Sequence, residues 1–386
     1  MAELSFQGRW RFMVVFVAAL VALMATTTAT AAASPNRTVV VEVTGWLRLY
    51  SDGAVERLTP PGAEPFAADV PPYDVPRGGV TVHDLATGRR GVDVRLYLPE
   101  RRPAAPAPAG GARRPVLVHF HGGGFCISRA SWAMYHNFYA PLAAELGVAA
   151  IVSVYLPLAP ERRLPAAIDA GHAALLWLRD VACGRHNISS SSSTAAVRRL
   201  RAAADFSRVF LIGDSSGGNL VHLVAARAGE DRHGGALHPV RLAGGVLLHP
   251  GFAREERSRS ELENPPSMFL TQEMIDKLLA LAVPLGFNKD SLYTSPELAA
   301  KAVAHVPMPP LLLMAAEKDL LRDPQVDYGK VMASYGKEVE TVISRGNVSH
   351  VFYLNFFAVK SDSFTMNRTM ELVDAIRKFI YPHRSM

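Results

Sequence analysis

The chain has 386 residues, which at about 150 residues per domain suggests two or three domains, although one α/β domain with insertions can also absorb this length. Hydrophobic residues make up 49% and charged residues 20%, a composition that excludes a mainly disordered chain. Two cysteines, Cys126 and Cys183, are too few for a disulfide scaffold or a multi-cysteine zinc module. The net charge of +6 comes from arginine pairs dispersed among acidic residues, which favours a solvated surface over a nucleic-acid-binding face.

The first 33 residues have the pattern of a targeting segment. Arg9 and Arg11 precede a strongly apolar run at 12–25, which is shorter than the roughly 20 residues that a spanning helix needs. Small residues follow at Ala29 and Ala31, where signal cleavage prefers them. The sequence therefore predicts a secretory signal peptide within 1–33 and a secretory or extracellular location. The alternative is an uncleaved signal that anchors the protein to a membrane.

Four N-x-S/T sequons are consistent with passage through the secretory pathway, and each would need an exposed loop to be glycosylated. They lie at Asn36, Asn187, Asn347 and Asn367. Because sequons arise often by chance, they add little to the prediction from the N-terminus.

The segment 34–78 is expected to form a small N-terminal unit. Two β-rich runs within 39–58 flank the turn Ser-Asp-Gly at 51–53, which predicts a hairpin. A proline-rich link follows at 60–76. A second strand pair is expected at 80–85 and 92–98.

A Pro/Ala/Gly linker lies at 100–114, and after it short apolar runs alternate with helical patterns through the rest of the chain. We assign residues 79–384, which include the second strand pair and this linker, to one catalytic domain. This alternation predicts a mostly parallel sheet with helices on both faces. The expected strands are at 116–120, 149–154, 209–212, 242–248, 311–316 and 339–343. The expected helices include 165–179, 219–228, 271–282 and 325–335. A serine run and an Arg/Ala stretch at 185–204 suggest an exposed insertion.

The strongest chemical motif is Gly213-Asp-Ser215-Ser216-Gly217, which lies between an apolar strand and a helix. Glycines at these positions permit a tight strand-to-helix turn that exposes a serine hydroxyl as a nucleophile. The alternative is an ordinary Gly/Ser-rich loop, but the flanking elements favour Ser215 as a nucleophile.

A serine nucleophile needs a base, and the base needs an acid that orients it. Among the histidines after Ser215, His350 lies in a turn seven residues past the last apolar run, where a loop side chain can reach a serine. Asp319 follows the strand expected at 311–316, at the edge where site residues of parallel sheets gather. Asp323 is better placed to cap the next helix. We therefore expect His350 to be the base and Asp319 the orienting acid.

The stretch His121-Gly122-Gly123-Gly124-Phe125 follows the strand expected at 116–120. Backbone N–H groups of Gly123 and Gly124, together with that of Ser216, are expected to form an oxyanion hole. His121, Gly122 and Phe125 are expected to face the substrate. A triple glycine could also form a phosphate nest, but its position favours the hole.

These residues resemble the plant carboxylesterases, in the hormone-sensitive-lipase-like and gibberellin-receptor-like branch of the α/β-hydrolase superfamily. The matching stretches are HGGGF (121–125), LAPERRLPAA (158–167), DFSRVFLIGDSSGGN (205–219), LHPGF (248–252), AEKDLLRD (316–323) and SHVFYLN (349–355). The resemblance implies an α/β-hydrolase fold, an N-terminal lid over the pocket, and the roles of nucleophile, acid and base for Ser215, Asp319 and His350.

The resulting functional prediction is a serine carboxylesterase without cofactor or metal, which hydrolyses small or aromatic esters, including ester or lactone signalling molecules. Its partner would be the small-molecule ester, with no nucleic acid and no obligatory protein partner. Two relatives define the alternatives: hormone receptors of this branch lack the histidine that is present here as His350, and dehydratases of the branch eliminate water. Ser349 stands where the family favours glycine and completes the sequon at Asn347, so a glycan there would crowd the site mouth. Cys126 is expected to be a buried small residue rather than a reactive thiol.

Overall fold

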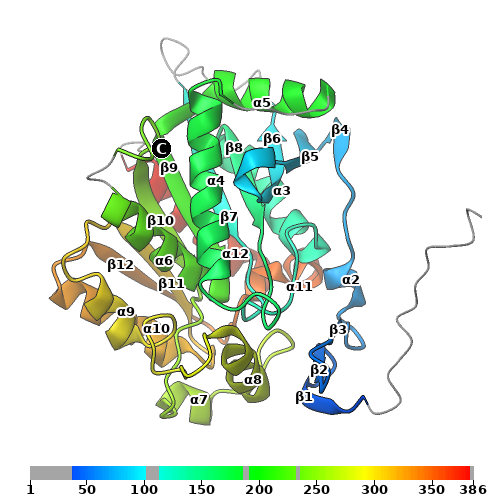
Figure 1. The fold of residues 1–386 in the computed structure, drawn as a ribbon, viewed down its shortest axis with the longest axis vertical. Helices are drawn as coiled ribbons and strands as arrows, with labels where there is room; N and C mark the ends of the chain where they lie inside the picture. Colours follow the sequence, from blue (N-terminus) through cyan, green and yellow to red (C-terminus); the bar gives the residue numbers. More distant parts are fainter. Residues whose placement is uncertain (1–36, 101–112, 186–190, 232–234, 383–386) are drawn as a thin grey trace, which may run out of the picture.

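The computed structural model describes residues 37–100, 113–185, 191–231 and 235–382 (Figure 1). The predicted signal segment at 1–33, most of the predicted linker and the sequons at Asn36 and Asn187 lie outside these residues. Within the described part of the chain, no helix combines the length and the apolar character needed to cross a membrane.

The N-terminal segment forms a three-stranded antiparallel sheet of β1 (Val39–Val43), β2 (Leu47–Tyr50) and β3 (Val55–Arg57). The predicted turn at 51–53 joins β2 to β3. The first expected strand is split by a second turn, in which Gly45 has a φ of +74°. A Cβ at Gly45 would lie 2.8 Å from Cβ of Pro60, so the turn also depends on the absence of a side chain. The predicted hairpin is therefore present, with one additional strand.

A nine-stranded sheet forms the centre of the molecule, in the order β12-β11-β10-β9-β7-β8-β6-β5-β4. Five of its eight neighbouring pairs are parallel, and the three at the β4 edge are antiparallel. The strands are β4 (Tyr73–Arg77), β5 (Val80–Ala86), β6 (Asp93–Pro99), β7 (Arg114–Phe120), β8 (Ala150–Tyr155), β9 (Ala204–Asp214), β10 (Leu242–Leu248), β11 (Leu311–Ala316) and β12 (Val339–Ser344). All eight strands expected from 80–85 onward are confirmed, and the mostly parallel sheet with them.

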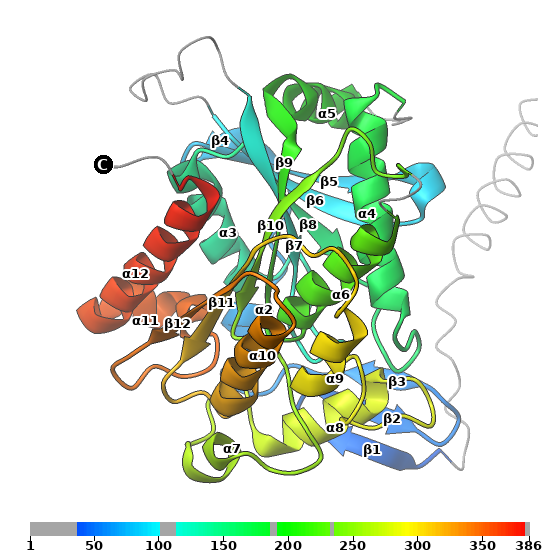
Figure 2. The ribbon, with the colours of Figure 1, turned by 90° about the vertical axis from the view of Figure 1, so that its left-hand side faces the viewer.

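Helices cover both faces of this sheet (Figure 2). One face carries α4 (Ala166–Ala182), α5 (Ser191–Ala203), α6 (Ser216–Glu230) and α10 (Arg322–Ser334), and the other carries α3 (Ala133–Leu146) and α12 (Ser363–Ile380). The shorter helices are α2 (Glu64–Ala67), α7 (Arg259–Glu263), α8 (Gln272–Ala282), α9 (Pro296–Ala302) and α11 (Phe356–Ser361). The strands between the two helical layers are apolar on both sides, because neither face meets water.

The segment predicted to be an exposed insertion is instead part of the core. Residues 191–203 form α5, and its side chains Ala196, Val197 and Leu200 are fully buried. The prediction failed because the serine and arginine content concealed a single apolar stripe, which is enough to pack a helix against the sheet.

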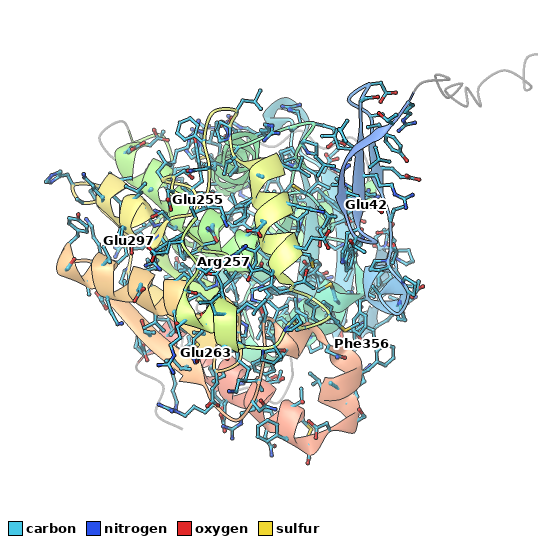
Figure 3. All side chains as sticks on the ribbon, turned by 90° about the horizontal axis from the view of Figure 1, so that it is seen from below. Glu42, Glu255, Arg257, Glu263, Glu297 and Phe356 are labelled. Carbon is cyan, nitrogen blue, oxygen red and sulfur yellow. The ribbon has the colours of Figure 1, made fainter. Side chains whose placement is uncertain are left out.

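The N-terminal sheet, which carries Glu42, lies against α8 (Figure 3), and it also contacts the loop that follows β7. Lys277 of α8 donates to the backbone oxygen of Glu42 at 2.7 Å. Arg57 at the end of β3 donates to the backbone oxygens of Cys126 at 2.7 Å and Ala159 at 3.0 Å, and it pairs with Glu161 at 2.7 Å. A single arginine thus links the N-terminal sheet to two loops of the larger domain.

We expect Arg57→Met to lower the free energy of unfolding by about 1–3 kcal/mol, because the backbone oxygens of Cys126 and Ala159 lose their charged hydrogen-bond donor. The measurement is urea unfolding followed by tryptophan fluorescence. Arg48→Met is the matched control, since Arg48 lies on the same sheet and pairs with Glu42 and Glu56 at its exposed surface. An equal loss in both variants would contradict this view of how the sheet is held.

Candidate functional site

Ser215 occupies a sharp turn between β9 and α6. Its backbone has φ 53° and ψ −126°, a conformation that non-glycine residues adopt only where the surroundings enforce it. The backbone N–H of Ser215 donates to Leu248 of β10 at 2.9 Å, and its backbone oxygen accepts from Gly218 at 2.8 Å and Gly251 at 2.9 Å. The turn is therefore held from both sides, and the strand–turn–helix geometry is the one expected for a nucleophile elbow.

The two glycines of the motif are required by close backbone contacts. A Cβ at Gly217 would lie 2.0 Å from the backbone oxygen of Phe120, and a Cβ at Gly213 would lie 2.3 Å from that of Gly217. No side chain fits at either position without moving the main chain of β7 or α6. These contacts bring the Ser215 turn directly against the end of β7, where the glycine loop begins.

The structure brings together Asp319 and His350, the two residues expected to be the acid and the base. His350 Nδ1 is 2.7 Å from Asp319 Oδ2, and both side chains are buried. Asp319 also accepts from Leu321 N at 2.9 Å and from Gln325 Nε2 at 2.8 Å. Burial acts to raise the pKa of the Asp319 carboxyl, but the adjacent His350 ring and these hydrogen bonds outweigh it and hold that pKa below its usual range. The carboxylate is thus kept ionised against the imidazole.

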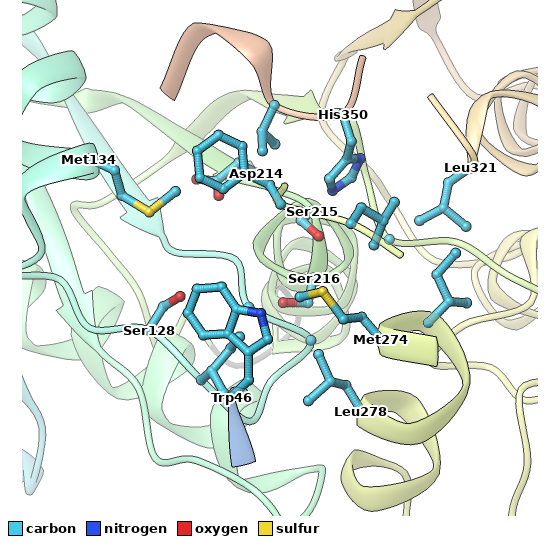
Figure 4. A pocket seen from close by; sticks show the side chains of 18 of the residues that line it. Trp46, Ser128, Met134, Asp214, Ser215, Ser216, Met274, Leu278, Leu321 and His350 are labelled. Atoms are coloured by element: carbon cyan, nitrogen blue, oxygen red, sulfur yellow. The ribbon is translucent and has the colours of Figure 1, made fainter. Parts of the chain in front are cut away.

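The Nε2 atom of His350 is buried and has no hydrogen-bond partner among the described residues. It lines the same cavity as Ser215, and Figure 4 shows the imidazole pointing toward the serine. The hydrogen bond of Nδ1 to a carboxylate places the ring proton on Nδ1 and leaves Nε2 as an acceptor. No direct hydrogen bond joins Ser215 to His350, and in serine hydrolases this contact often tightens only in the complex with substrate.

Two residues that the sequence did not point to, His249 and Glu317, hold the loop that carries His350. His249, directly after β10, accepts from the backbone N–H of Val351 at 2.8 Å. Glu317, directly after β11, accepts from Gly346 N at 2.6 Å and from Asn347 N at 3.3 Å, and these two hydrogen bonds lower the pKa of its carboxyl. Only the position of both residues at strand ends could have drawn attention to them.

Gly123 and Gly124 line the same cavity, with φ values of 100° and 58°. A Cβ at Gly123 would lie 2.3 Å from the backbone oxygen of Ile127, so this position accepts only glycine. Within the described residues, nothing accepts a hydrogen bond from the N–H of Gly123, Gly124 or Ser216. The structure therefore brings the three N–H groups that were expected to form an oxyanion hole to one cavity.

The three residues expected to face the substrate do not line this cavity. His121 is buried and hydrogen-bonds through Nδ1 to the backbone oxygen of Gly122 at 2.9 Å. The N–H of Gly122 donates to Asp214 at 3.1 Å, and that of Phe125 donates to Ser216 Oγ at 3.2 Å. These residues support the glycine loop from behind, because its backbone turns away from the cavity on either side of Gly123 and Gly124.

A second set of serine, histidine and aspartate lies beneath the loop. His119 Nδ1 is 2.7 Å from Ser153 Oγ, and its Nε2 is 3.3 Å from Asp214 Oδ1. Ser153 and His119 are fully buried within β8 and β7, and neither lines the cavity. His119 of this set contacts the Asp214 carboxylate, which also accepts a hydrogen bond from the N–H of Gly122.

The cavity above Ser215 is apolar and has an empty volume of about 690 Å³, which includes its opening to solvent. Trp46 of the N-terminal sheet and Trp132 stack at a centroid distance of 6.4 Å on one side, and Met274 and Leu278 of α8 lie on another (Figure 4). Among the described residues that line it, Asp214 and His350 are the only ones with titratable acidic or imidazole groups. The cavity therefore suits an uncharged, largely apolar ligand.

Both cysteines are free. Cys126 is buried, its thiol contacts the backbone oxygen of Leu278 at 3.4 Å, and burial raises its pKa to about 12, as expected for an inert thiol. Cys183 is exposed.

One group of metal-binding residue types, His249, Asp319 and His350, has ligand atoms within 4.8 Å of one another in the described chain. Asp319 Oδ2 and His350 Nδ1 are hydrogen-bonded to each other, and His249 Nδ1 accepts a hydrogen bond from the backbone N–H of Val351. We therefore describe the group as a hydrogen-bond network.

Comparison with known proteins identifies the family. Residues 117–354 match the family described as alpha/beta hydrolase fold, and the chain belongs to this family. Two solved structures share the fold: a carboxyl esterase 2 from the fungus Tuber melanosporum (TM-score 0.60, 21% identity, 82% of this chain and 94% of that one) and a hyperthermophilic esterase from the archaeon Pyrobaculum calidifontis (TM-score 0.59, 24% identity, 80% and 86%).

Plant proteins narrow the assignment. The chain is 31% identical to a probable carboxylesterase 6 of Arabidopsis thaliana, over 89% of this chain and 92% of that protein. It is 34% identical to a 3-O-acetylpapaveroxine carboxylesterase of Papaver somniferum over 60% and 71%, and 33% identical to a chloroplastic tuliposide A-converting enzyme 2 of Tulipa gesneriana over 83% and 75%. Within the hydrolase superfamily, the chain is thus a plant carboxylesterase of the hormone-sensitive-lipase-like branch and a carboxylic ester hydrolase.

The names of the tulip relatives place them in chloroplasts or amyloplasts, which does not fit the secretory signal predicted for 1–33. Of the two described sequons, Asn347 lies in the exposed loop before His350, as expected, whereas Asn367 lies on the exposed side of α12 rather than in a loop.

The buried His249 makes stability depend on pH. Burial lowers the pKa of His249 to about 3, whereas an unfolded histidine has a pKa of about 6.5. Between these values the unfolded chain binds a proton that the native protein does not. The stabilisation is therefore complete above about pH 6.5 and is lost as the pH falls toward 3, by roughly 1 kcal/mol per pH unit.

His249→Asn should remove this titration while the asparagine oxygen still accepts a hydrogen bond from Val351 N–H. The number of protons taken up on unfolding between pH 4 and 6, given by the slope of the unfolding free energy against pH, should therefore decrease by about one. His249→Phe should decrease the slope equally but also lower stability at pH 7, because Val351 N–H loses its acceptor. The measurement is urea unfolding at a series of pH values. A slope equal to that of the parent in both variants would contradict this prediction.

Proposed function

We propose that the protein hydrolyses small or aromatic carboxylic esters through Ser215 as nucleophile, His350 as base and Asp319 as orienting acid. The observation that carries the proposal is the 2.7 Å contact between His350 Nδ1 and Asp319, with Nε2 buried and unpartnered in the cavity of Ser215. Ser153 and His119 of the second Ser–His–Asp set are fully buried and do not line the cavity, so that serine has no access to a substrate.

In the first half of the reaction, Ser215 Oγ attacks the ester carbonyl carbon while His350 Nε2 takes its proton. The tetrahedral oxyanion receives hydrogen bonds from the N–H groups of Gly123, Gly124 and Ser216. The imidazolium, stabilised by the Asp319 carboxylate, then gives its proton to the leaving alcohol oxygen, and the C–O bond breaks. The products are the free alcohol and an acyl ester on Ser215.

In the second half, His350 takes a proton from water, which attacks the acyl carbon through the same oxyanion site. The proton returns to Ser215 Oγ as the acyl bond breaks, so the carboxylic acid leaves and the enzyme is restored. His350 accepts and returns the proton in both halves of the proposed reaction.

The apolar cavity limits which esters react. The acyl part would lie among Trp46, Trp132 and the α8 side chains Met274 and Leu278, where no charge could be neutralised. Uncharged acyl groups are therefore preferred, and the size of the cavity favours short chains or a single aromatic ring.

We expect residues 34–386 to hydrolyse p-nitrophenyl acetate and butyrate. Ser215→Ala and His350→Ala should each lower kcat by about 10⁶-fold, and Asp319→Asn by about 10⁴-fold because the imidazole then adopts the wrong tautomer. Initial rates measured by p-nitrophenolate absorbance test this expectation.

Ser153→Ala is the matched control, since it removes the hydroxyl of the buried second set. It should retain most of the activity, and a loss as large as that of Ser215→Ala would contradict the assignment. A parent protein that is inert toward these esters but binds an apolar hormone-like ligand would indicate a receptor instead.

We also propose that residues 1–33 direct the protein into the secretory pathway, on the basis of the charged start, short apolar run and small residues at 29 and 31. Fusion of residues 1–36 to a fluorescent protein in plant cells tests this. Fluorescence in the endoplasmic reticulum supports the proposal, and import into plastids, as the names of the tulip relatives suggest, would overturn it.

A further inference from the structure

Trp46 brings a hydrogen-bond donor into the apolar cavity above Ser215. It belongs to the turn between β1 and β2, and only 8% of the residue is exposed. Within the described residues no group accepts a hydrogen bond from its indole N–H, although Nε1 keeps some accessible surface. Figure 4 shows the ring in the cavity, with Nε1 on the side that faces Ser216 and Met274. A buried donor without an acceptor costs stability unless a ligand completes it.

The orientation of this indole is fixed before any ligand binds. The backbone N–H of Trp46 donates to Val43 at 2.8 Å, and its backbone oxygen accepts from Leu58 at 2.8 Å. The ring stacks on that of Trp132, with an angle of 25° between the two planes. A donor held in this way loses little conformational entropy when a ligand binds, so its hydrogen bond contributes to affinity.

The chemistry of the indole limits what it can bind. An indole N–H donates a hydrogen bond and cannot accept one, so the ligand must supply an acceptor. Among the described residues that line the cavity there is no Lys or Arg, and the carboxylate of Asp214 is one of them, so an anionic acceptor would remain uncompensated. The acceptor is therefore an uncharged oxygen, such as that of a ketone, an ether or a second ester.

The proposed function, on which this inference rests, decides which half of the ester lies beside Trp46. His350 gives its proton to the leaving alcohol oxygen, so the alcohol half lies on the side of His350. In Figure 4, Ser215 lies between His350 and Trp46. The acyl half, on the other side of the carbonyl carbon, is therefore the part that extends toward the indole.

We propose that Trp46 is a specificity-determining residue whose indole N–H binds an uncharged oxygen in the acyl half of the substrate. The substrates are then esters of alkoxy or oxo acids, in preference to plain alkanoates of the same length. An alkanoate places a CH2 group where the oxygen would lie, leaves the N–H unpaired and reacts more slowly.

The test uses p-nitrophenyl esters in pairs that differ at one position of the acyl chain, where an ether oxygen replaces a CH2 group. The pairs are methoxyacetate with butyrate, 3-methoxypropanoate with pentanoate, and 4-methoxybutanoate with hexanoate, so the oxygen moves along the chain. The pair ratio is kcat/KM of the ether ester divided by that of the alkanoate. The oxygen also activates the carbonyl, but this effect is the same in every variant and cancels when pair ratios are compared between proteins.

We expect the pair ratio of the parent to be about threefold to tenfold higher than that of Trp46→Phe for at least one pair, because a hydrogen bond between uncharged groups is worth about that factor. The phenyl ring keeps an aromatic side chain against Trp132 but removes the N–H. Because each ratio is taken within one protein, partial misfolding of a variant does not alter it.

Two control variants separate the N–H from the other effects of the substitution. Met274→Ala enlarges the cavity at its α8 wall and removes no donor, so it should leave the pair ratios unchanged. Trp132→Phe makes the same replacement in the other ring of the stack, which is only partly buried, and it should also leave them unchanged.

Pair ratios that Trp46→Phe leaves unchanged at every chain position, or that Met274→Ala or Trp132→Phe lowers as much, would overturn the inference while p-nitrophenyl butyrate is still hydrolysed. Absence of p-nitrophenyl butyrate hydrolysis by the parent would instead overturn the proposed function, and the inference with it.

Discussion

The close contact between the Ser215 turn and the end of β7 is the constraint on which the rest of the site depends. Gly217 lies so near the backbone oxygen of Phe120 that a Cβ would be 2.0 Å away. This contact brings the start of α6 next to the glycine loop, so that Gly123, Gly124 and Ser216 line the same cavity. Ser216 Oγ and Asp214 then fix the loop through Phe125 and Gly122.

The loop that carries His350, the proposed base, is held by hydrogen bonds at the other side of the cavity. Residues that follow two adjacent parallel strands, His249 after β10 and Glu317 after β11, bind backbone N–H groups on either side of His350. Because parallel strands end at the same edge, the sheet itself determines the distance between these two anchors. Asp319, the proposed orienting acid, comes from the same edge, so the orientation of the imidazole follows from the register of β10 and β11.

Much of this arrangement could be predicted from the sequence, because it depends on local patterns. Alternating apolar runs predicted the strands from β5 to β12, and the glycines around Ser215 predicted the turn. The roles of His121, Gly122 and Phe125 could not be derived, since whether a loop residue faces a cavity or supports it from behind depends on backbone dihedral angles. The burial of α5 was also missed, because three apolar side chains among serines and arginines gave too weak a periodic signal.

Arg57 gives the N-terminal sheet a mechanical connection to the reaction centre. The sheet contributes Trp46 to the cavity, and Arg57 binds the backbone of Cys126, two residues after Gly124. A ligand too large for the cavity would press on Trp46 and so on the sheet, and a displaced sheet would pull through Arg57 on the loop that we propose to bind the oxyanion. Size discrimination in this enzyme would thus act on turnover as well as on fit: a bulky ester that enters would do so at the expense of the geometry that makes it react.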